Sequence, residues 1–270
     1  MRPAALVGSV VLLAAALLIG GCGGASKPPA PPAEPAEPVT VTLYIPCVLG
    51  GPLRKVIAPY EAKHPKVQFA LQTYKPSELP AASKGPTAII TAGDIEMASL
   101  VRAGVVNQAD ARTFAINTYP LAVVTAAEGG VGLRSRDDLA KPSVKRILID
   151  DPAKSSLGAA AKQAFEKLGL WEKLRAKVAA PKPGVMVLSD IVEKKADAAV
   201  VFRDCLLEGG SPPKTIRIVG EMPLDLYPLI PYRAAALGAG PQQPIARAFV
   251  DFLTGEEGKE ALRKAGLKPS

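Results

Sequence analysis

Apolar and polar positions along the chain predict alternating strands and helices. Strands are expected where apolar residues alternate with polar ones or run together, at residues 39–45, 66–72, 87–91, 145–150, 198–202 and 216–219. Helices are expected where apolar residues recur at helical spacing, at residues 52–63, 94–103, 155–168, 186–195, 244–253 and 256–265. Pro52 suits a first helical position, and Asp94 is expected to cap its helix. This order predicts an α/β protein with parallel strands, in which helix N-termini face one edge of a sheet.

The N-terminal 38 residues are expected to lie outside the folded part. Residues 1–21 contain Arg2, an apolar run and small residues, which is the pattern of a secretory signal peptide. The small residues followed by Cys22 resemble a bacterial lipobox, which implies cleavage before Cys22 and a lipid on its thiol. Residues 22–38 are rich in proline and predict an extended tether. We therefore expect an extracytoplasmic (periplasmic) protein anchored to a membrane by lipid; an uncleaved anchor helix is the alternative, and the membrane leaflet is left open.

Charge and composition exclude several classes of function. The chain has 33 Lys and Arg residues against 25 Asp and Glu residues, a net charge of +8. These cations are scattered with few aromatic residues beside them, so no nucleic-acid partner is expected. His64 is the single histidine, and neither a phosphate-binding loop nor paired cysteines with zinc spacing occur. The sequence therefore predicts no enzyme, no cofactor and no metal site of its own.

The segment 146–204 resembles the second lobe of the periplasmic molybdate-binding proteins that serve ABC importers. The motifs that carry the resemblance are Asp151-Pro152, Gly158-Ala159, Leu168-Gly169-Leu170-Trp171 and residues 196–202, followed more loosely by Ala92-Gly93-Asp94 and residues 100–106, 114–117, 227–229 and 248–253. The resemblance implies a two-lobed periplasmic-binding-protein fold with a hinge of two crossover strands, expected within residues 115–125 and 226–235. Lobe 1 would comprise residues 39–122 and 226–270, and lobe 2 residues 123–225.

The same resemblance implies a monomer that binds a small oxyanion, molybdate or tungstate, in the cleft between the lobes and delivers it to an ABC permease. Amide groups at helix starts and hydroxyl groups would hold the anion. The expected ligand-binding residues are Cys47, Val48, Gly50, Ser77, Ala92, Gly93, Ser156, Gly158, Val185, Phe202 and Cys205. The chain departs from the family at Phe202, which has no hydroxyl group where the family has a tyrosine. The identities of the ligand and of the permease are left open.

The resemblance implies that Cys47 and Cys205 both lie on loops at the cleft, one in each lobe. Three alternatives remain open from the sequence. The two residues form a disulfide, remain unlinked thiols, or together hold a soft ligand such as a thiophilic metal ion. The last alternative gives a second hypothesis for function, a binding or sensor module of the same fold for a soft metal ion or another small ligand.

Overall fold

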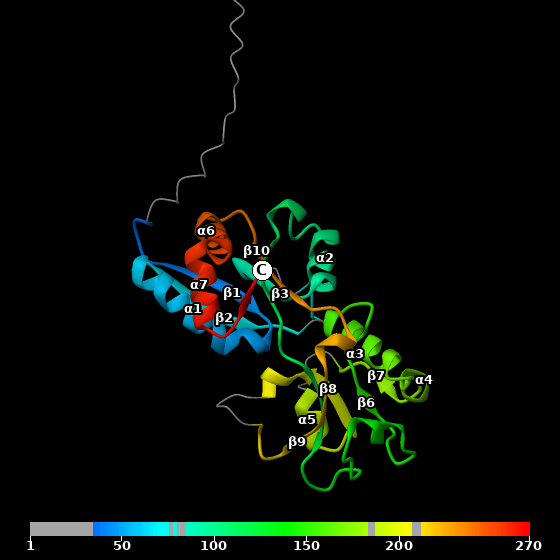
Figure 1. The fold of residues 1–270 in the computed structure, drawn as a ribbon. Coiled ribbons are helices and arrows are strands. Elements are labelled where there is room, and N and C mark those ends of the chain that lie inside the picture. The colour runs from blue at the N-terminus through cyan, green and yellow to red at the C-terminus, as the bar shows by residue number, and fades with distance from the viewer. Residues whose placement is uncertain (1–34, 76–77, 80, 82–84, 183–186, 207–211) are drawn as a thin grey trace, which may run out of the picture. The chain divides into compact units, whose positions relative to one another are not determined.

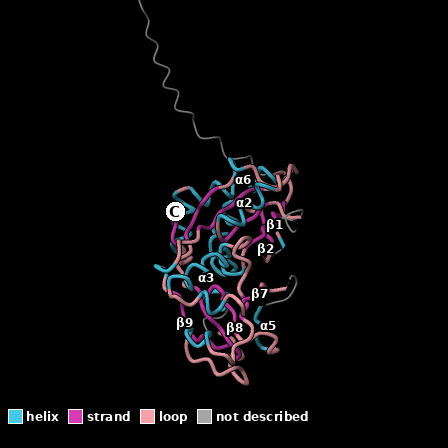
Figure 2. Tube along the Cα trace, turned by 90° about the vertical axis from the view of Figure 1, so that its right-hand side faces the viewer, coloured by secondary structure: helices cyan, strands magenta, loops and turns pink. Residues whose placement is uncertain are grey.

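The computed structural model describes residues 35–75, 78–79, 81, 85–182, 187–206 and 212–270, and these residues form two sheets with helices on their faces (Figures 1 and 2). The strands are β1 Val39–Ile45, β2 Val67–Thr73, β3 Ala88–Ala92, β4 Arg112–Ile116, β5 Leu121–Ala126, β6 Ile147–Leu148, β7 Val178–Ala179, β8 Ala198–Phe202, β9 Ile216–Met222, β10 Pro231–Ala236 and β11 Lys268–Pro269. The helices are α1 Gly50–Lys63, α2 Asp94–Arg102, α3 Ser156–Lys167, α4 Trp171–Leu174, α5 Val187–Val192, α6 Gln243–Thr254 and α7 Glu256–Lys264. The predicted signal peptide and most of the tether, with Cys22, lie outside the described residues.

The first sheet has the strand order β11-β4-β10-β3-β1-β2. Strands β1, β2 and β3 are parallel, and β10 runs antiparallel to both β3 and β4. All five residues of β3 are buried, and its side chains alternate between two cores. Ile90 joins the core that includes buried residues of α1 and α6, whereas Ile89 packs with Met97 and Leu100 of α2. A strand covered on both faces in this way needs a nearly continuous apolar run, which β3 supplies.

The second sheet has the order β7-β6-β8-β5-β9. Strands β6, β7 and β8 are parallel, while β5 pairs antiparallel with β8 and β9. Helix α3 covers one face through buried residues such as Phe165, and α5 covers the other through Ile191. Both sheets therefore place helix N-termini beyond the carboxyl ends of parallel strands, as the sequence pattern predicts.

The chain passes twice between the sheets, after β4 and before β10, through segments that lie side by side (Figure 1). The amide of Asn117 donates to the carbonyl of Ile230 at 2.8 Å, and the amide of Leu121 donates to the hydroxyl of Tyr227 at 3.1 Å. The predicted single crossover strand 115–125 is wrong in detail, because β4 ends at Ile116 and β5 begins at Leu121. Between them the side chain of Asn117 accepts the amide of Tyr119 at 2.9 Å and turns the chain.

Several predicted boundaries also need correction. Helix α1 begins at Gly50, so Pro52 is its third residue and not its first. Gly93 occupies the N-cap position of α2, and the side chain of Asp94 pairs with Arg233 at 3.0 Å instead of capping the helix. The strand predicted at residues 145–150 is reduced to the two residues of β6. None of the helices in the described part of the chain is both long and apolar enough to cross a membrane.

Candidate functional site

The predicted ligand-binding residues follow the carboxyl ends of parallel strands in both sheets. In the first sheet these strands end at Ile45, Thr73 and Ala92, and in the second at Leu148, Ala179 and Phe202. Carboxyl ends of parallel strands share one edge of a sheet, and ligands of open α/β sheets bind outside that edge. Two direct contacts show that the two edges meet.

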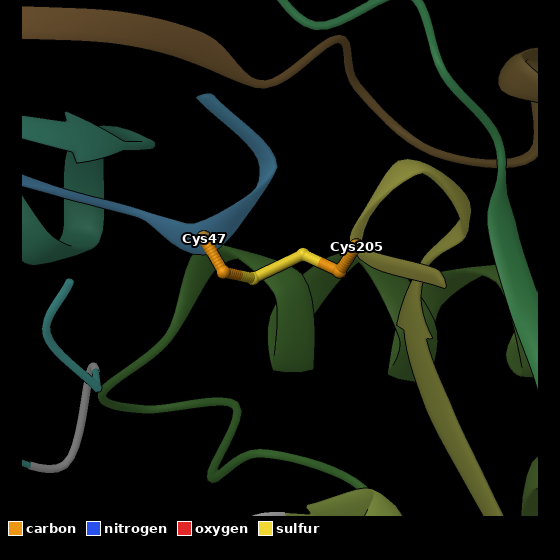
Figure 3. The surroundings of a disulfide bond; sticks show 2 residues. All are labelled: Cys47 and Cys205. Atoms are coloured by element: carbon orange, nitrogen blue, oxygen red, sulfur yellow. A yellow bond between two sulfur atoms is a disulfide. The ribbon is translucent and has the colours of Figure 1, made fainter. Parts of the chain in front are cut away.

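The first contact is a disulfide bond between Cys47, just after β1, and Cys205, just after β8 (Figure 3). The two Cα atoms lie 5.9 Å apart, although the residues are separated by 158 positions in the sequence. Of the three alternatives left open by the sequence, the structure has the disulfide. The alternatives of unlinked thiols and of a soft ligand held by both thiols are therefore wrong for this state, because a disulfide leaves no thiolate to bind a metal. Among the described residues, no group of three or more His, Cys, Asp or Glu side chains could hold a metal ion.

The second contact joins Glu96, in the first turn of α2, to Ser156, the first residue of α3. The amide of Ser156 donates to Glu96 Oε1 at 2.8 Å, and its hydroxyl donates to Glu96 Oε2 at 2.6 Å. The amide of Ile95 in turn donates to Ser156 Oγ at 3.2 Å. The N-termini of two helices from different sheets thus converge on one serine and one carboxylate.

Gly93 makes this close approach possible. Its φ of 122° lies in a region that favours glycine, and a Cβ atom there would lie 1.9 Å from Ser156 Oγ. The buried hydroxyl of Thr91 donates to the Gly93 carbonyl at 3.0 Å and holds the turn between β3 and α2. The sequence Thr91-Ala92-Gly93 therefore fixes the start of α2 against α3.

The start of α3 is organised by Ser155, which is its N-cap. Ser155 Oγ accepts the amide of Gly158 at 3.4 Å and donates to Asp150 Oδ2 at 3.1 Å. A Cβ atom on Gly158 would lie 2.2 Å from the carbonyl oxygen of Asp150. Gly158 is thus needed for close packing, and its amide is already engaged by the cap instead of facing a ligand.

Burial controls the acid–base properties of the Glu96 carboxylate. Glu96 is only 3% exposed, and no ion pair among the described residues involves it. Burial raises the pKa of Glu96, while the hydrogen bonds from Ser156 and Ser155 act in the opposite direction. Burial likewise raises the pKa of Asp150, against the hydrogen bond from Ser155. The carboxylate of Glu96 is therefore held by hydrogen-bond donors and not by a cation.

Two buried tyrosines add hydroxyl groups near these contacts. Tyr74 is 6% exposed and Tyr232 is fully buried, and neither hydroxyl has a hydrogen-bond partner in the described part of the chain. Burial raises the pKa of both phenols, and the charge of Glu96 raises the pKa of Tyr74 further. For Tyr232 the additional charge is that of Asp204, the residue before Cys205. Such unpaired buried hydroxyls are costly and need an explanation.

A pocket of about 280 Å³ lies directly beside the Glu96 contact. It is lined by Leu79, Ile95, Glu96, Ser99, Arg102, Ala153 and Lys154. The lining thus brings together α2 and the turn before α3. Arg102 and Lys154 add two positive charges to a pocket whose buried end carries a carboxylate.

The structure brings some predicted residues together and separates others. Cys47 is bonded to Cys205, and Gly93 touches Ser156. Val48, Ala92 and Phe202 are buried and belong to the core, and the space around a Cβ on Gly50 is empty. Ser77 and Val185 lie outside the described residues.

Sequence reasoning missed Glu96, Tyr74 and Tyr232. Glu96 had one detectable signal, because it lies four residues before the buried Leu100 and therefore on the same face of α2. An acidic residue in a first helical turn is nevertheless most often a solvated partner of the helix dipole. The tyrosines had no comparable signal, since each lies in or beside a strand where aromatic residues are common.

Comparisons with known proteins agree with this architecture. A family model described as bacterial extracellular solute-binding protein matches residues 41–268. YvgL of Bacillus subtilis (strain 168), which is named as an ABC transporter substrate-binding lipoprotein, is 24% identical over 262 residues, 96% of each chain. The molybdate-binding protein ModA of Rhodobacter capsulatus is 30% identical over 128 residues, which cover 47% of this chain and 48% of ModA. This last match therefore spans about half the length of either protein.

A solved structure shows the shared fold. The periplasmic molybdate-binding protein of Azotobacter vinelandii matches with a TM-score of 0.62 and 18% identity, covering 84% of this chain and 98% of that one. The expected two-lobed α/β fold of the periplasmic binding proteins is thereby confirmed. The chain belongs to the bacterial extracellular solute-binding proteins and is similar in sequence to molybdate-binding proteins.

Proposed function

We propose that the chain is an extracytoplasmic lipoprotein that binds a molybdate- or tungstate-like oxyanion for an ABC importer. The observation that supports this proposal most strongly is the convergence of the α2 and α3 N-termini at Ser156. The amide and the hydroxyl of Ser156 donate to the carboxylate of Glu96, and the amide of Ile95 donates to Ser156 Oγ, so donors from both helix starts converge at this contact. A carboxylate and an oxyanion use the same donors.

Electrostatics favour an anion at this place. The unpaired amides and the dipole at a helix N-terminus attract negative charge, and here two helices contribute. Arg102 and Lys154 line the adjoining pocket and add positive charge on the solvent side. The hydroxyls of Tyr74 and Tyr232, which have no hydrogen-bond partner among the described residues, offer further donors to an anion that has lost its water. Burying an anion without such donors is costly.

The remaining parts of the proposal concern localisation and partners. A signal peptide and a lipid on Cys22 would hold the protein on the outer side of a membrane, where it delivers its ligand to a permease. The protein acts as a monomer and performs no catalysis. The relatives' names support transport of molybdate, and the ligand of this chain is the part that an experiment must decide.

A thermal-shift screen of the full chain tests the proposal. A ligand that binds only the folded state at about 100 times its dissociation constant adds about 2.7 kcal/mol to the free energy of unfolding. We expect molybdate or tungstate to raise the melting temperature of the wild type, with sulfate and phosphate as competitors in the same panel. Ser156→Ala removes one donor and is expected to reduce the shift. A panel in which no oxyanion moves the transition contradicts the proposed function.

A further inference from the structure

We infer that Glu96 is a tethered competitor of the ligand, whose carboxylate occupies the anion site and must leave before an oxyanion binds. This inference rests on the proposed function and identifies a residue that determines affinity and selectivity. The Glu96 carboxylate and an external anion would need the same donors on Ser156. Both carboxylate oxygens of Glu96 are already bound to Ser156, at 2.8 and 2.6 Å, so the same amide and hydroxyl cannot serve an external anion at the same time.

Charge strengthens this competition. Glu96 is almost fully buried and lacks a cationic partner among the described residues, so its charge is balanced by hydrogen bonds from serine residues, chiefly those of Ser156. An oxyanion placed within a few ångströms of an ionised carboxylate is repelled, and the low local dielectric makes that repulsion strong. Glu96 and the anion therefore exclude each other from the site.

The pocket beside the site gives the displaced side chain a place to go. Glu96 itself lines this cavity of about 280 Å³. Arg102, the last residue of α2, and Lys154, in the turn before α3, line it as well. Among the described residues Lys154 pairs with Asp151 alone, at 3.5 Å, and its exposed ammonium group can receive a second carboxylate. Glu96 consequently has two positions available, one on Ser156 and one toward the cations of the pocket.

The hydroxyl of Tyr74 explains why an external oxyanion displaces the carboxylate of Glu96 from Ser156. This hydroxyl is buried and has no hydrogen-bond partner in the described part of the chain, and the charge of Glu96 raises its pKa. A carboxylate has two oxygens, both occupied here, whereas a tetrahedral oxyanion has four. The additional oxygens accept the Tyr74 hydroxyl, which removes the cost of an unpaired buried donor. Free monocarboxylates, which offer no more than Glu96 offers, are rejected.

Isothermal titration of the full chain with molybdate, tungstate, sulfate and acetate tests this inference. Glu96→Gln keeps the size of the side chain and removes its charge. Asp94→Asn is the matched control, because it removes a charge from the same turn of α2 at an exposed side chain that pairs with Arg233 and does not contact Ser156. We expect Glu96→Gln to bind the preferred oxyanion about tenfold or more tighter than the wild type, and Asp94→Asn to change the affinity by less than about threefold.

Each outcome decides between the two claims. If the wild type binds an oxyanion and Glu96→Gln binds it no more tightly, the inference is wrong and the proposed function stands. An equal gain in Asp94→Asn also overturns it, because the effect is then one of net charge. If neither the wild type nor the variant binds any oxyanion, the proposed function and the inference both fail.

A measurement on the wild type covers the case in which Glu96→Gln does not fold. A crystal structure of the wild type soaked in tungstate should show the Glu96 carboxylate withdrawn from Ser156 and turned into the pocket. Tungstate bound with both Glu96–Ser156 hydrogen bonds still in place overturns the inference. Glu96→Ala gives the same comparison in solution if the glutamine variant alone is unstable.

Discussion

The disulfide between Cys47 and Cys205 should contribute a large share of the protein's stability. The two residues are separated by 158 positions, and the bond fastens the end of β1 in the first sheet to the end of β8 in the second. A cross-link lowers the conformational entropy of the unfolded chain, by an amount that grows with the logarithm of the number of residues in the loop that it closes. For a loop of this length the chain-entropy model gives about 5 kcal/mol, and loss of a native disulfide typically costs about 2–5 kcal/mol.

The perturbation is the double substitution Cys47→Ser/Cys205→Ser, which leaves no unpaired thiol at the site. Urea unfolding of the full chain, followed by circular dichroism, should give a free energy of unfolding lower by about 2–5 kcal/mol than that of the oxidised wild type. Dithiothreitol should lower the free energy of unfolding of the wild type by a similar amount and leave that of the double variant unchanged. This insensitivity of the variant is the control for effects of the reductant on Cys22.

A midpoint that is the same in the wild type and in the double variant would refute this reasoning. It would mean that the cysteines are unlinked in solution, or that the unfolded chain is too compact for the loop to matter. Quantifying free thiols in the unfolded wild type separates these two explanations. The linked protein should show only the thiol of Cys22, if that residue is not lipidated.

The remaining predictions concern the two helix starts and the buried acids. Gly158→Ala should lower the free energy of unfolding by about 1–3 kcal/mol, because its Cβ would meet the backbone of Asp150 at 2.2 Å. In the same urea assay, Gly51→Ala should raise it by about 0.4–1 kcal/mol, because the space around that position of α1 is open. Gly93→Ala should cost about 1–3 kcal/mol in backbone strain and weaken oxyanion binding in a titration, since its Cβ would push Ser156 away; unchanged binding would contradict the site. Because burial raises the pKa of Glu96 in the folded state, the folded protein holds its proton more tightly than the unfolded chain. Stability should therefore rise as the pH falls from neutral toward the ordinary carboxyl value of 4.5, and Glu96→Gln should reduce this slope in melting curves.

Much of the fold could be predicted from the sequence because its main elements are defined locally. Residues 39–45 and 198–202 alternate or are continuously apolar between clear boundaries, and both strands match the structure to the residue. Short strands could not be predicted in the same way. β7 and β11 have two residues each and exist only through their pairing with β6 and β4, so no periodicity marks them.

The sequence predicts where a site would lie but not its detail. The ends of parallel strands and the small residues around Gly93 and Ser156 predict a site at two sheet edges, and the structure brings these edges into contact at Ile95 and Ser156. The pairing of Cys47 with Cys205 depends on how two distant loops meet, which local sequence does not encode. The inward position of Glu96 depends in the same way on the approach of α3, and a single acid on a helix carries no sign of it.

The central claim is that the N-termini of α2 and α3 together bind one oxyanion. Isothermal titration of the full-length wild type and of Ser156→Ala with molybdate and tungstate tests this claim most directly. The account predicts saturable binding of one anion per chain to the wild type, with an affinity at least about tenfold weaker in Ser156→Ala, since a lost hydrogen bond to a charged group costs about 1.5–3 kcal/mol. Absence of binding in the wild type, or equal affinity in both proteins, would contradict it.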